Sequence, residues 1–550
     1  MSREEAARWG AWLVLLALIA LAWSNALHGA FTYDDKVEVI GNKTIRFLEQ
    51  WRLVLAYNWS RPITIGTYAL NFHAAGFEPF SYHVVDVVLH GVTAGIAMLL
   101  GVALAEARQL PRPLWFGFFG AGLWALHPLT TESVTYVTGR SEQLCALFYL
   151  LGCLAWTRWC LEGGAARAAL ALGAMVLGIF SKEVAVTMPV AFLLIEVFAI
   201  RGGDLRAVRW RRYAPWALAV LAFLGLRWRI YGAITTPHPA LRPLGVQVFT
   251  EAEVIWRYVQ LSVVPLGQSV FHDHAPTGPT ARSIAAMLGL IGIVGGSIAA
   301  RSRAPLIALG SLWFLLVLAP SSSVVPLKET MAEHRAYVSL LGLCWIAAAG
   351  LSRLPRNAAV AVFAAAAMLL GTLTWKRNAV WATEVSLWAD ATQQNTASAE
   401  AWYGYGDALR LAKRLPEARD AYTRSAELAP GLLDAWNNLG MVEAMSGRDK
   451  AAEDTWRKLL RDHPTYCKAH NNLGLLHARN ERPLDAAAEF RTTLAYCPRD
   501  CRAHRYLGEL YAGPVDDREK AILHLETFLD VCPDDTMSDE VRALLNKLTF

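Results

Sequence analysis

Residues 1–376 contain a succession of apolar stretches, most of them about as long as a helix that crosses a bilayer. Lipid offers no partner to backbone N–H and C=O groups, so such stretches fold as α-helices packed into a bundle. We predict eleven membrane spans, near residues 9–28, 84–105, 114–131, 143–161, 165–181, 184–200, 214–231, 284–300, 304–320, 336–351 and 357–374.

Two stretches can be interpreted in two ways. Residues 9–28 are long enough to span and lack a convincing small-residue cleavage site behind them, so we predict an uncleaved first span rather than a signal peptide. Residues 252–271 are interrupted by charged residues and Pro265. This stretch could span the membrane or lie along its surface as an amphipathic helix.

Arginines decide between eleven and twelve spans, because cytoplasmic loops are enriched in Lys and Arg. With eleven spans, every loop on one side carries at least two arginines: Arg3 and Arg8, Arg108 and Arg112, Arg158 and Arg167, five between Arg201 and Arg212, Arg301 and Arg303, and Arg353 and Arg356. A twelfth span would move the last two pairs to the other side. We therefore predict eleven spans, with the carboxyl-terminal part outside the cytoplasm.

The two parts of the chain differ in charge. Residues 1–376 hold 30 Lys and Arg against 20 Asp and Glu, whereas residues 377–550 hold 22 against 27. The basic membrane part suits anionic lipid head groups or a phosphate-bearing substrate. No basic stripe or base-stacking motif accompanies this charge, so nucleic acid is not an expected partner.

The acidic part repeats itself every 34 residues. Glycines and prolines mark the repeat: Gly406, Gly440, Gly474 and Gly508, and Pro430, Pro464, Pro498 and Pro533. This is the pattern of tetratricopeptide repeats (TPRs), in which small residues lie where paired helices touch. We predict a linker helix at 377–398, four repeats forming an α-solenoid at 399–535, and a capping helix at 536–550.

TPR arrays usually bind an extended peptide in a concave groove. Asn438 and Asn472 fall at one repeat position, where their amides could bond the backbone of an acceptor peptide. They could equally be ordinary solvated helix residues.

Four of the eight cysteines follow the repeat period: Cys467 and Cys501 open repeats, and Cys497 and Cys532 close them. The two ends of an antiparallel helix pair are adjacent, so Cys467–Cys497 and Cys501–Cys532 are candidate disulfides, which require an oxidising compartment. Free thiols or a Cys497–Cys501 pair are the alternatives.

Ionisable residues gather at the predicted outer face. Asp34 and Asp35 lie in the first outer loop (about residues 29–83), and adjacent carboxylates at a membrane surface suggest a general base. His83, Asp86 and His90 share one helix face, and we favour a hydrogen-bonded cluster over a metal site because no fourth ligand has suitable spacing. The outer loops also supply Arg61, His127, Glu132, Arg140, Lys182, Glu183, Glu333, His334 and Arg335.

Arg140, Lys182 and Arg335 are unexpected in short outer loops, where Lys and Arg should be scarce. A phosphate group bound at the outer leaflet would explain them, since guanidinium and ammonium donors match its oxygens. Each could instead pair with an acid close to it in sequence. No glycine-rich phosphate loop, serine-hydrolase signature or HExxH zinc motif occurs, which argues against an ATP-driven pump or a serine hydrolase.

Short motifs follow one another in a specific order: Tyr33-Asp34-Asp35, Arg61-Pro62, Tyr82-His83, His127-Pro128, Gly139-Arg140, Ser181-Lys182-Glu183 and Glu333-His334-Arg335-Ala336-Tyr337. In this order, and with repeats behind them, they resemble the transmembrane and TPR-containing (TMTC) protein family over essentially the whole chain. Two features depart from that family: Asp86 stands where an Asn is expected in a His-x-x-Asn pattern, and there are only four repeats.

The resemblance implies a C-type glycosyltransferase fold with an active site facing the lumen or periplasm. It implies O-mannosylation of Ser and Thr from a polyprenyl-phosphate-linked mannose, with Asp34 as the catalytic base and Asp35 as its companion. We expect Arg140, Lys182 and Arg335 to hold the donor phosphate without a required cofactor, although the carboxylate pair leaves room for a divalent cation.

We therefore expect a multi-pass membrane glycosyltransferase that modifies proteins presented by its own repeats. Its compartment would be a bacterial inner membrane with periplasmic repeats, or the endoplasmic reticulum membrane with lumenal repeats in a eukaryote. A transferase acting on a lipid-linked glycan is one alternative, and a non-catalytic TPR scaffold for envelope complexes is another.

Overall fold

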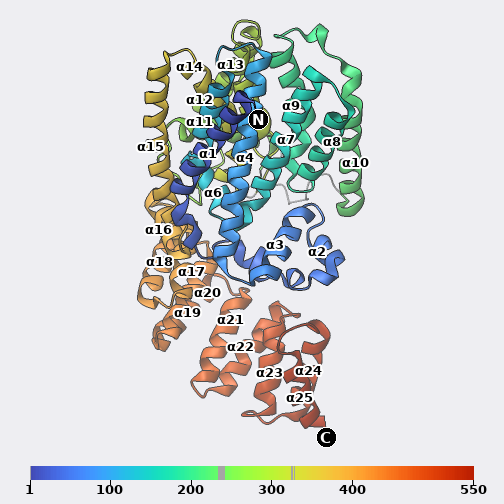
Figure 1. The fold of residues 1–550 in the computed structure, drawn as a ribbon. Helices are drawn as coiled ribbons and strands as arrows, with labels where there is room; N and C mark the ends of the chain where they lie inside the picture. The colour runs from blue at the N-terminus through green and yellow to red at the C-terminus, as the bar shows by residue number, and fades with distance from the viewer. Residues whose placement is uncertain (1, 233–241, 324–325, 328, 550) are drawn as a thin grey trace. The chain divides into compact units, whose positions relative to one another are not determined.

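The computed structural model describes residues 2–232, 242–323, 326–327 and 329–549. All regular secondary structure in these residues is helical, so the predicted all-α fold is confirmed. The chain divides into two compact units, Met1–Gln394 and Asn395–Phe550, and each is described by itself (Figure 1).

The first unit is a bundle. Its α-helices are α1 (Arg3–Ala22), α2 (Trp51–Tyr57), α3 (Pro62–Ala75), α4 (Pro79–Ala107), α5 (Pro113–Ala125), α6 (Thr131–Val134), α7 (Arg140–Glu162), α8 (Ala165–Ile179), α9 (Met188–Leu194), α10 (Ala214–Tyr231), α11 (Leu244–Val263), α12 (Ala281–Ala299), α13 (Pro305–Leu318), α14 (Leu340–Leu351), α15 (Arg356–Val380) and α16 (Glu384–Gln394).

Each of the eleven predicted spans overlaps a helix in the described residues. Among the residues that the structure describes, six helical segments are both long and apolar enough to cross a membrane: Arg3–Ala22, Pro79–Ala107, Val137–Glu162, Glu183–Ile200, Ala281–Ala299 and Arg356–Val380. The apolar helices α8, α13 and α14 are shorter. The chain is therefore a polytopic membrane protein, and the count of eleven stays a prediction.

Proline sets where several helices begin. Pro62, Pro79, Pro113 and Pro305 each occupy the first helical position, where the missing N–H has no intrahelical partner to lose. Proline also ends the predicted span 114–131 early, because α5 stops at Ala125, shortly before Pro128. Residues 127–139 fold instead into short helical turns, nearly all of them buried inside the bundle.

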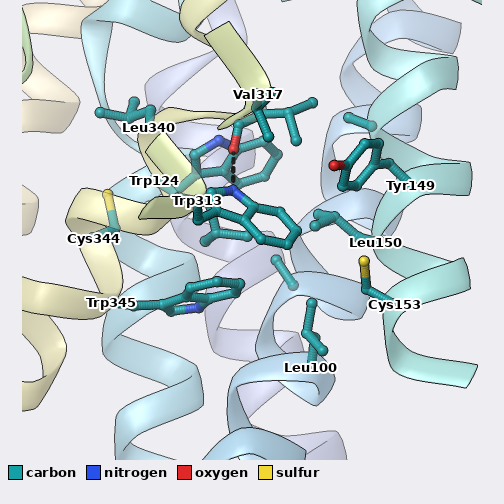
Figure 2. Close-up of a cluster of buried hydrophobic side chains, with 14 of the residues drawn as sticks. Leu100, Trp124, Tyr149, Leu150, Cys153, Trp313, Val317, Leu340, Cys344 and Trp345 are labelled. Carbon is teal, nitrogen blue, oxygen red and sulfur yellow. Dashed lines mark hydrogen bonds between the residues drawn. The ribbon is translucent and has the colours of Figure 1, made fainter. Parts of the chain in front are cut away.

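The bundle core is rich in tryptophan. Trp313 packs against the Trp345 ring at 4.9 Å and the Tyr149 ring at 5.4 Å between centroids (Figure 2). Its indole N–H donates to the Val338 carbonyl at 3.0 Å, which satisfies the one polar atom of a fully buried side chain. Helices α13 and α14 cross at Gly310 and Gly342, where any side chain would collide with the other backbone.

Two segments differ from the sequence expectation. Only the first part of the doubtful stretch 252–271 is helical, because it belongs to the helix α11, which ends at Val263. The polar residues Gln247, Glu251 and Glu253 of α11 are buried in the protein. The predicted linker at 377–398 is divided, since its first residues complete α15, residues 384–394 form α16 in the first unit, and residues 395–398 belong to the second unit.

The second unit is a row of helix pairs closed by one further helix. Its helices are α17 (Ala399–Leu411), α18 (Leu415–Leu428), α19 (Leu433–Met445), α20 (Asp449–Asp462), α21 (Cys467–Arg479), α22 (Pro483–Tyr496), α23 (Cys501–Ala512), α24 (Arg518–Val531) and α25 (Ser538–Thr549). Four consecutive pairs and a cap are the arrangement expected of four TPRs.

Candidate functional site

A cavity of about 430 Å³ in the first unit collects residues from segments far apart in sequence. Its acidic and basic lining residues are Asp34, Arg61, Glu142, Lys182, Glu183, Arg227, His334 and Arg335. Six of the ionisable residues that the sequence places at one membrane face therefore meet around one space, namely Asp34, Arg61, Lys182, Glu183, His334 and Arg335. A cavity with several convergent charged groups is the default candidate for a functional site.

The two adjacent aspartates differ in exposure and in their hydrogen bonds. Asp34 is exposed and lines the cavity, and its backbone N–H donates to the Tyr136 hydroxyl at 3.2 Å. Asp35 is fully buried and accepts hydrogen bonds from the Thr138 N–H (2.8 Å) and hydroxyl (2.6 Å) and from the Thr32 N–H. Burial raises the pKa of Asp35 to about 7 although these bonds favour its charge. Asp35 therefore fixes the loop, and Asp34 is the member of the pair that lines the cavity.

Glu183 joins two arginines in the cavity wall. Its carboxylate pairs with Arg61 at 3.1 Å and with Arg227 at 3.2 Å. Arg227 lies near the end of α10, and sequence reasoning missed it because it is embedded in a predicted span. The signal was available, since an arginine within an apolar helix needs a polar partner or a wet cavity.

Lys182 does not pair with Glu183, its neighbour in sequence. It forms an ion pair with Glu142, and both side chains line the cavity. Glu142 comes from the first turn of α7, so this pair connects two separate parts of the cavity wall.

Arg335 is bound to backbone carbonyls. Its guanidinium donates to the Thr330 carbonyl at 3.3 Å and the Glu329 carbonyl at 3.1 Å. Within the described residues, no carboxylate lies within ion-pair distance of this guanidinium. Arg335 thus brings a positive charge to the cavity that no described carboxylate directly neutralises.

The buried Glu132 and the half-buried His334 form a pair at the cavity edge. Glu132 accepts from His334 Nδ1 at 2.6 Å and from the His334 backbone N–H at 3.0 Å. Burial raises the pKa of Glu132 to about 7, and burial, together with the charge of Lys182, lowers the pKa of His334 to about 3. The imidazole that faces the cavity is consequently neutral near pH 7.

Glu333 is a structural residue. It accepts hydrogen bonds from the Gln268 side chain (2.7 Å), the Ser269 N–H (2.7 Å) and His272 Nε2 (2.8 Å). Burial alone would raise the pKa of Glu333, but the bonds to His272 and Gln268 and the positive charge of Arg377 hold this pKa below the usual range. Glu333 therefore ties the segment before α14 to the loop after α11 and does not pair with Arg335.

Arg140 does not line the cavity, which corrects its assignment to a donor phosphate. Its guanidinium is fully buried and pairs with Asp86 at 2.6 Å. It also donates to Asn71 Oδ1 at 2.7 Å and to the Tyr82 carbonyl at 3.1 Å. All of its donor groups are directed into the protein, so none reaches a ligand.

Three of the predicted site histidines lie outside the cavity and have separate backbone partners. His83 contacts the Gly29 carbonyl at 3.0 Å, His90 contacts the Ala125 carbonyl at 2.9 Å, and His127 contacts the Ser262 carbonyl at 3.1 Å. His83, Asp86 and His90 thus do not converge on one point. In the part of the chain that the structure describes, no three His, Cys, Asp or Glu side chains are placed to hold a metal ion.

In the repeats, the two asparagines bond to the neighbouring repeat. The Asn438 amide nitrogen donates to the Tyr403 hydroxyl at 3.1 Å, and that of Asn472 donates to Asn437 Oδ1 at 2.8 Å. Both are half-buried. An acceptor peptide would therefore have to share or displace bonds that already connect adjacent repeats.

The structure contains the disulfides Cys467–Cys497 and Cys501–Cys532, with Cα atoms 6.5 Å and 6.2 Å apart. Each joins the start of the first helix of a repeat to the residue after its second helix. The other four cysteines are free, and Cys145, Cys153 and Cys344 are buried in the bundle.

Fold and cavity together define a polytopic helical membrane protein with an ionisable cavity and a TPR array. No protein-family model matches the chain. The protein O-mannosyl-transferase TMTC3 of Homo sapiens is 21% identical over 481 residues, which cover 76% of this chain and 51% of that protein. The protein O-mannosyl-transferase Tmtc2 of Drosophila melanogaster is 28% identical over 220 residues, 36% of this chain and 23% of that protein.

The expected resemblance to the TMTC family is thus confirmed, and the chain spans about half the length of the TMTC3 proteins it matches. Among solved structures, the TPR protein YrrB, described as having an unusual peptide-binding site, is 21% identical. The match covers 32% of this chain and 89% of YrrB with a TM-score of 0.25. The helix pairs of the second unit themselves carry the TPR assignment.

Proposed function

We propose that this chain is a membrane glycosyltransferase that moves a hexose from a polyprenyl-phosphate donor to Ser or Thr hydroxyls of proteins held by its repeats. Mannose is the proposed sugar, because the similar TMTC3 and Tmtc2 are named protein O-mannosyl-transferases. The observation that carries the proposal is the cavity that Asp34 shares with four cationic residues, Arg61, Lys182, Arg227 and Arg335.

Asp34 suits the role of base. Transfer forms a bond between the acceptor hydroxyl oxygen and the anomeric carbon, and the hydroxyl proton must leave as that bond forms. An exposed carboxylate at the cavity wall can accept this proton, whereas Asp35 is buried and already holds three donor groups.

The cations suit the leaving group. The bond from the anomeric carbon to the phosphate oxygen breaks, so negative charge grows on the departing phosphate. Arg61 and Arg227 share Glu183, and Lys182 has Glu142, which leaves Arg335 to meet an added anion. One such guanidinium matches the single charge of a phosphodiester donor. We propose that transfer needs no divalent cation, and that EDTA leaves the rate unchanged.

The repeats are the proposed site of the acceptor protein, on the helices that carry Asn438 and Asn472. Both the cavity and the repeats are proposed to face away from the cytoplasm, in keeping with the arginine distribution along the membrane part. A periplasmic reporter such as alkaline phosphatase, fused after Phe550, should therefore be active, and a cytoplasmic location of this end would contradict the proposed orientation.

Mass spectrometry of envelope proteins tests the activity. Cells without the gene are complemented with wild type, Asp34→Asn or Glu49→Gln, the last being a control for an exposed acid elsewhere in the same loop. Hexose on Ser or Thr should be restored by wild type and by Glu49→Gln but not by Asp34→Asn. Unchanged protein glycosylation with altered lipid-linked glycans would favour the glycan transferase. If neither protein glycosylation nor lipid-linked glycans change, and Asp34→Asn restores the defects of the deletion strain as well as wild type does, a scaffold would be favoured.

A further inference from the structure

Helix α16 joins the last apolar helix to the repeats, and its first residue contacts the loop that carries Asp34. The Glu384 carboxylate accepts a hydrogen bond from the Tyr33 N–H at 3.1 Å and pairs with Lys36 at 2.7 Å. Its other oxygen accepts from the Trp388 indole at 3.2 Å, which orients the carboxylate from within α16. One side chain of α16 thus holds the chain on both sides of Asp34.

A second contact acts on the next residue. The Asp34 N–H donates to the Tyr136 hydroxyl, and the Tyr136 ring stacks on Trp381 with centroids 5.4 Å apart. Trp381 is buried between α15 and α16. The α15–α16 segment therefore holds two consecutive backbone N–H groups. Its Glu384 accepts from the Tyr33 N–H, and its Trp381 supports the Tyr136 ring whose hydroxyl accepts from the Asp34 N–H.

Tyr33 extends this connection toward Arg335. Its φ of +52° lies in the left-handed region, which a tyrosine adopts only when its surroundings hold it there. Its hydroxyl donates to the Glu329 carboxylate at 2.9 Å, and the Glu329 carbonyl accepts from Arg335 at 3.1 Å. A continuous series of contacts leads from Glu384 through Tyr33 and Glu329 to the guanidinium that faces the cavity.

We propose that Glu384 is a positioning residue, which fixes the backbone at Tyr33 so that the Asp34 carboxylate and the Arg335 guanidinium keep the geometry that transfer requires. Because α16 ends at Gln394 and the first repeat helix begins at Ala399, Glu384 lies on the covalent path from the repeats to the reacting groups. The inference rests on the proposed transferase function. A displacement of about 1 Å at reacting groups can cost roughly 100-fold in rate.

Kinetics of the full-length protein in detergent test this role, with undecaprenyl-phosphate mannose as donor and a peptide spanning a site found in the envelope comparison as acceptor. Glu384→Ala should lower kcat about 10- to 100-fold while the donor KM changes less than about threefold, since the groups are misplaced rather than removed. Glu384→Gln should stay within about fivefold of wild type, because its amide oxygen still accepts from the Tyr33 N–H. Gln393→Ala, an exposed change on the same helix, is the matched control.

The outcomes separate the two hypotheses. A wild-type protein inactive with this donor and peptide contradicts the proposed function, whereas an active wild type with equally active Glu384→Ala overturns the positioning role. If Glu384→Ala does not fold, as judged by size exclusion and thermal unfolding, Glu384→Asp decides. It keeps the charge but withdraws the carboxylate by one methylene, so kcat should fall, and a wild-type kcat would overturn the inference.

Discussion

Asp86 and Arg140 form a fully buried ion pair, with 2.6 Å between Asp86 Oδ1 and Arg140 Nε. Two tyrosine rings, Tyr68 and Tyr82, lie 5.1 Å and 5.5 Å from the guanidinium carbon and enclose it. This pair gives a physical reason for an Asp where an Asn was expected, because a buried guanidinium needs a negative partner. It also shows why Arg140 holds the fold together and does not line the cavity.

Removing one member of the pair should destabilise the protein strongly. Asp86→Ala leaves a buried guanidinium without a negative partner, so the free energy of unfolding should fall by about 3–5 kcal/mol. Thermal unfolding of the detergent-solubilised protein measures it, and the double variant Asp86→Leu/Arg140→Met should recover part of the loss. Glu49→Gln is the control, and an Asp86→Ala protein as stable as this control would contradict the assignment.

Arg335 should act on donor binding rather than on stability. Arg335→Gln removes the cavity guanidinium that no described carboxylate neutralises. The donor KM should therefore rise about 10- to 100-fold, which corresponds to the free energy that a hydrogen bond to a charged group contributes. The melting temperature should change little. Arg229→Gln, an exposed position on α10 close to Arg227, serves as the control. An unchanged donor KM would exclude Arg335 from the phosphate site.

Asp35 should make stability depend on pH. Its pKa of about 7 in the folded protein lies above the value of 3.8 for an ordinary Asp. Between about pH 4 and pH 7 the folded protein therefore holds a proton that the unfolded chain has lost, so the free energy of unfolding contributed by this residue falls as pH rises across that window.

The measurement compares melting temperatures of wild type and Asp35→Asn from pH 5 to pH 8. The wild type should lose stability relative to the variant up to about pH 7, with parallel behaviour above it. The comparison also removes the contribution of Glu132, whose raised pKa has the same sign and is common to both proteins. Parallel curves throughout would contradict the raised pKa of Asp35.

Much of the fold could be predicted from the sequence because its signals are local. Apolar length and the 34-residue period each specify helices without knowledge of tertiary contacts, and the regular cysteine spacing identified the two pairs that the structure joins. The predicted span 114–131 was too long, because apolar residues continue beyond Ala125 although the helix ends there, shortly before Pro128.

The candidate site could be predicted only as a set of residues. Sequence proximity suggested pairs of neighbours, but Lys182 reaches Glu142 and Glu333 reaches His272, partners that only the folded chain brings together. Residue type could not tell the buried Arg140 from the cavity-lining Arg335, since both lie in short polar loops of the sequence. The role of Glu384 could not be predicted either, because it depends on a contact with Tyr33 across more than 300 residues.

The two disulfides should stabilise the last two repeats. Each closes a loop of about 30 residues, and such a crosslink typically contributes about 2–4 kcal/mol. Cys467→Ser/Cys497→Ser should therefore make the carboxyl-terminal repeats cleavable by trypsin at a lower temperature than in the wild type. Cys153→Ser, at a free cysteine in the bundle, is the control. Thiol labelling of all eight cysteines in unreduced protein would contradict the pairing.

Replacing Gly440 should destabilise the repeats because the Trp456 ring lies beside it. A Cβ at this position of α19 would lie 2.6 Å from the Trp456 ring, whose indole N–H donates to the Asn437 carbonyl at 3.0 Å. The ring is buried and held by this bond, so it cannot move away without breaking it. Ala favours a helix over Gly by about 1 kcal/mol, but in Gly440→Ala the overlap with the ring should lower the free energy of unfolding by about 1–3 kcal/mol beyond that gain.

Gly431→Ala is the control, since nothing lies within 4 Å of a Cβ at position 431. Proteolysis of the repeats should distinguish the two variants, and equal resistance would show that the Trp456 ring can rearrange.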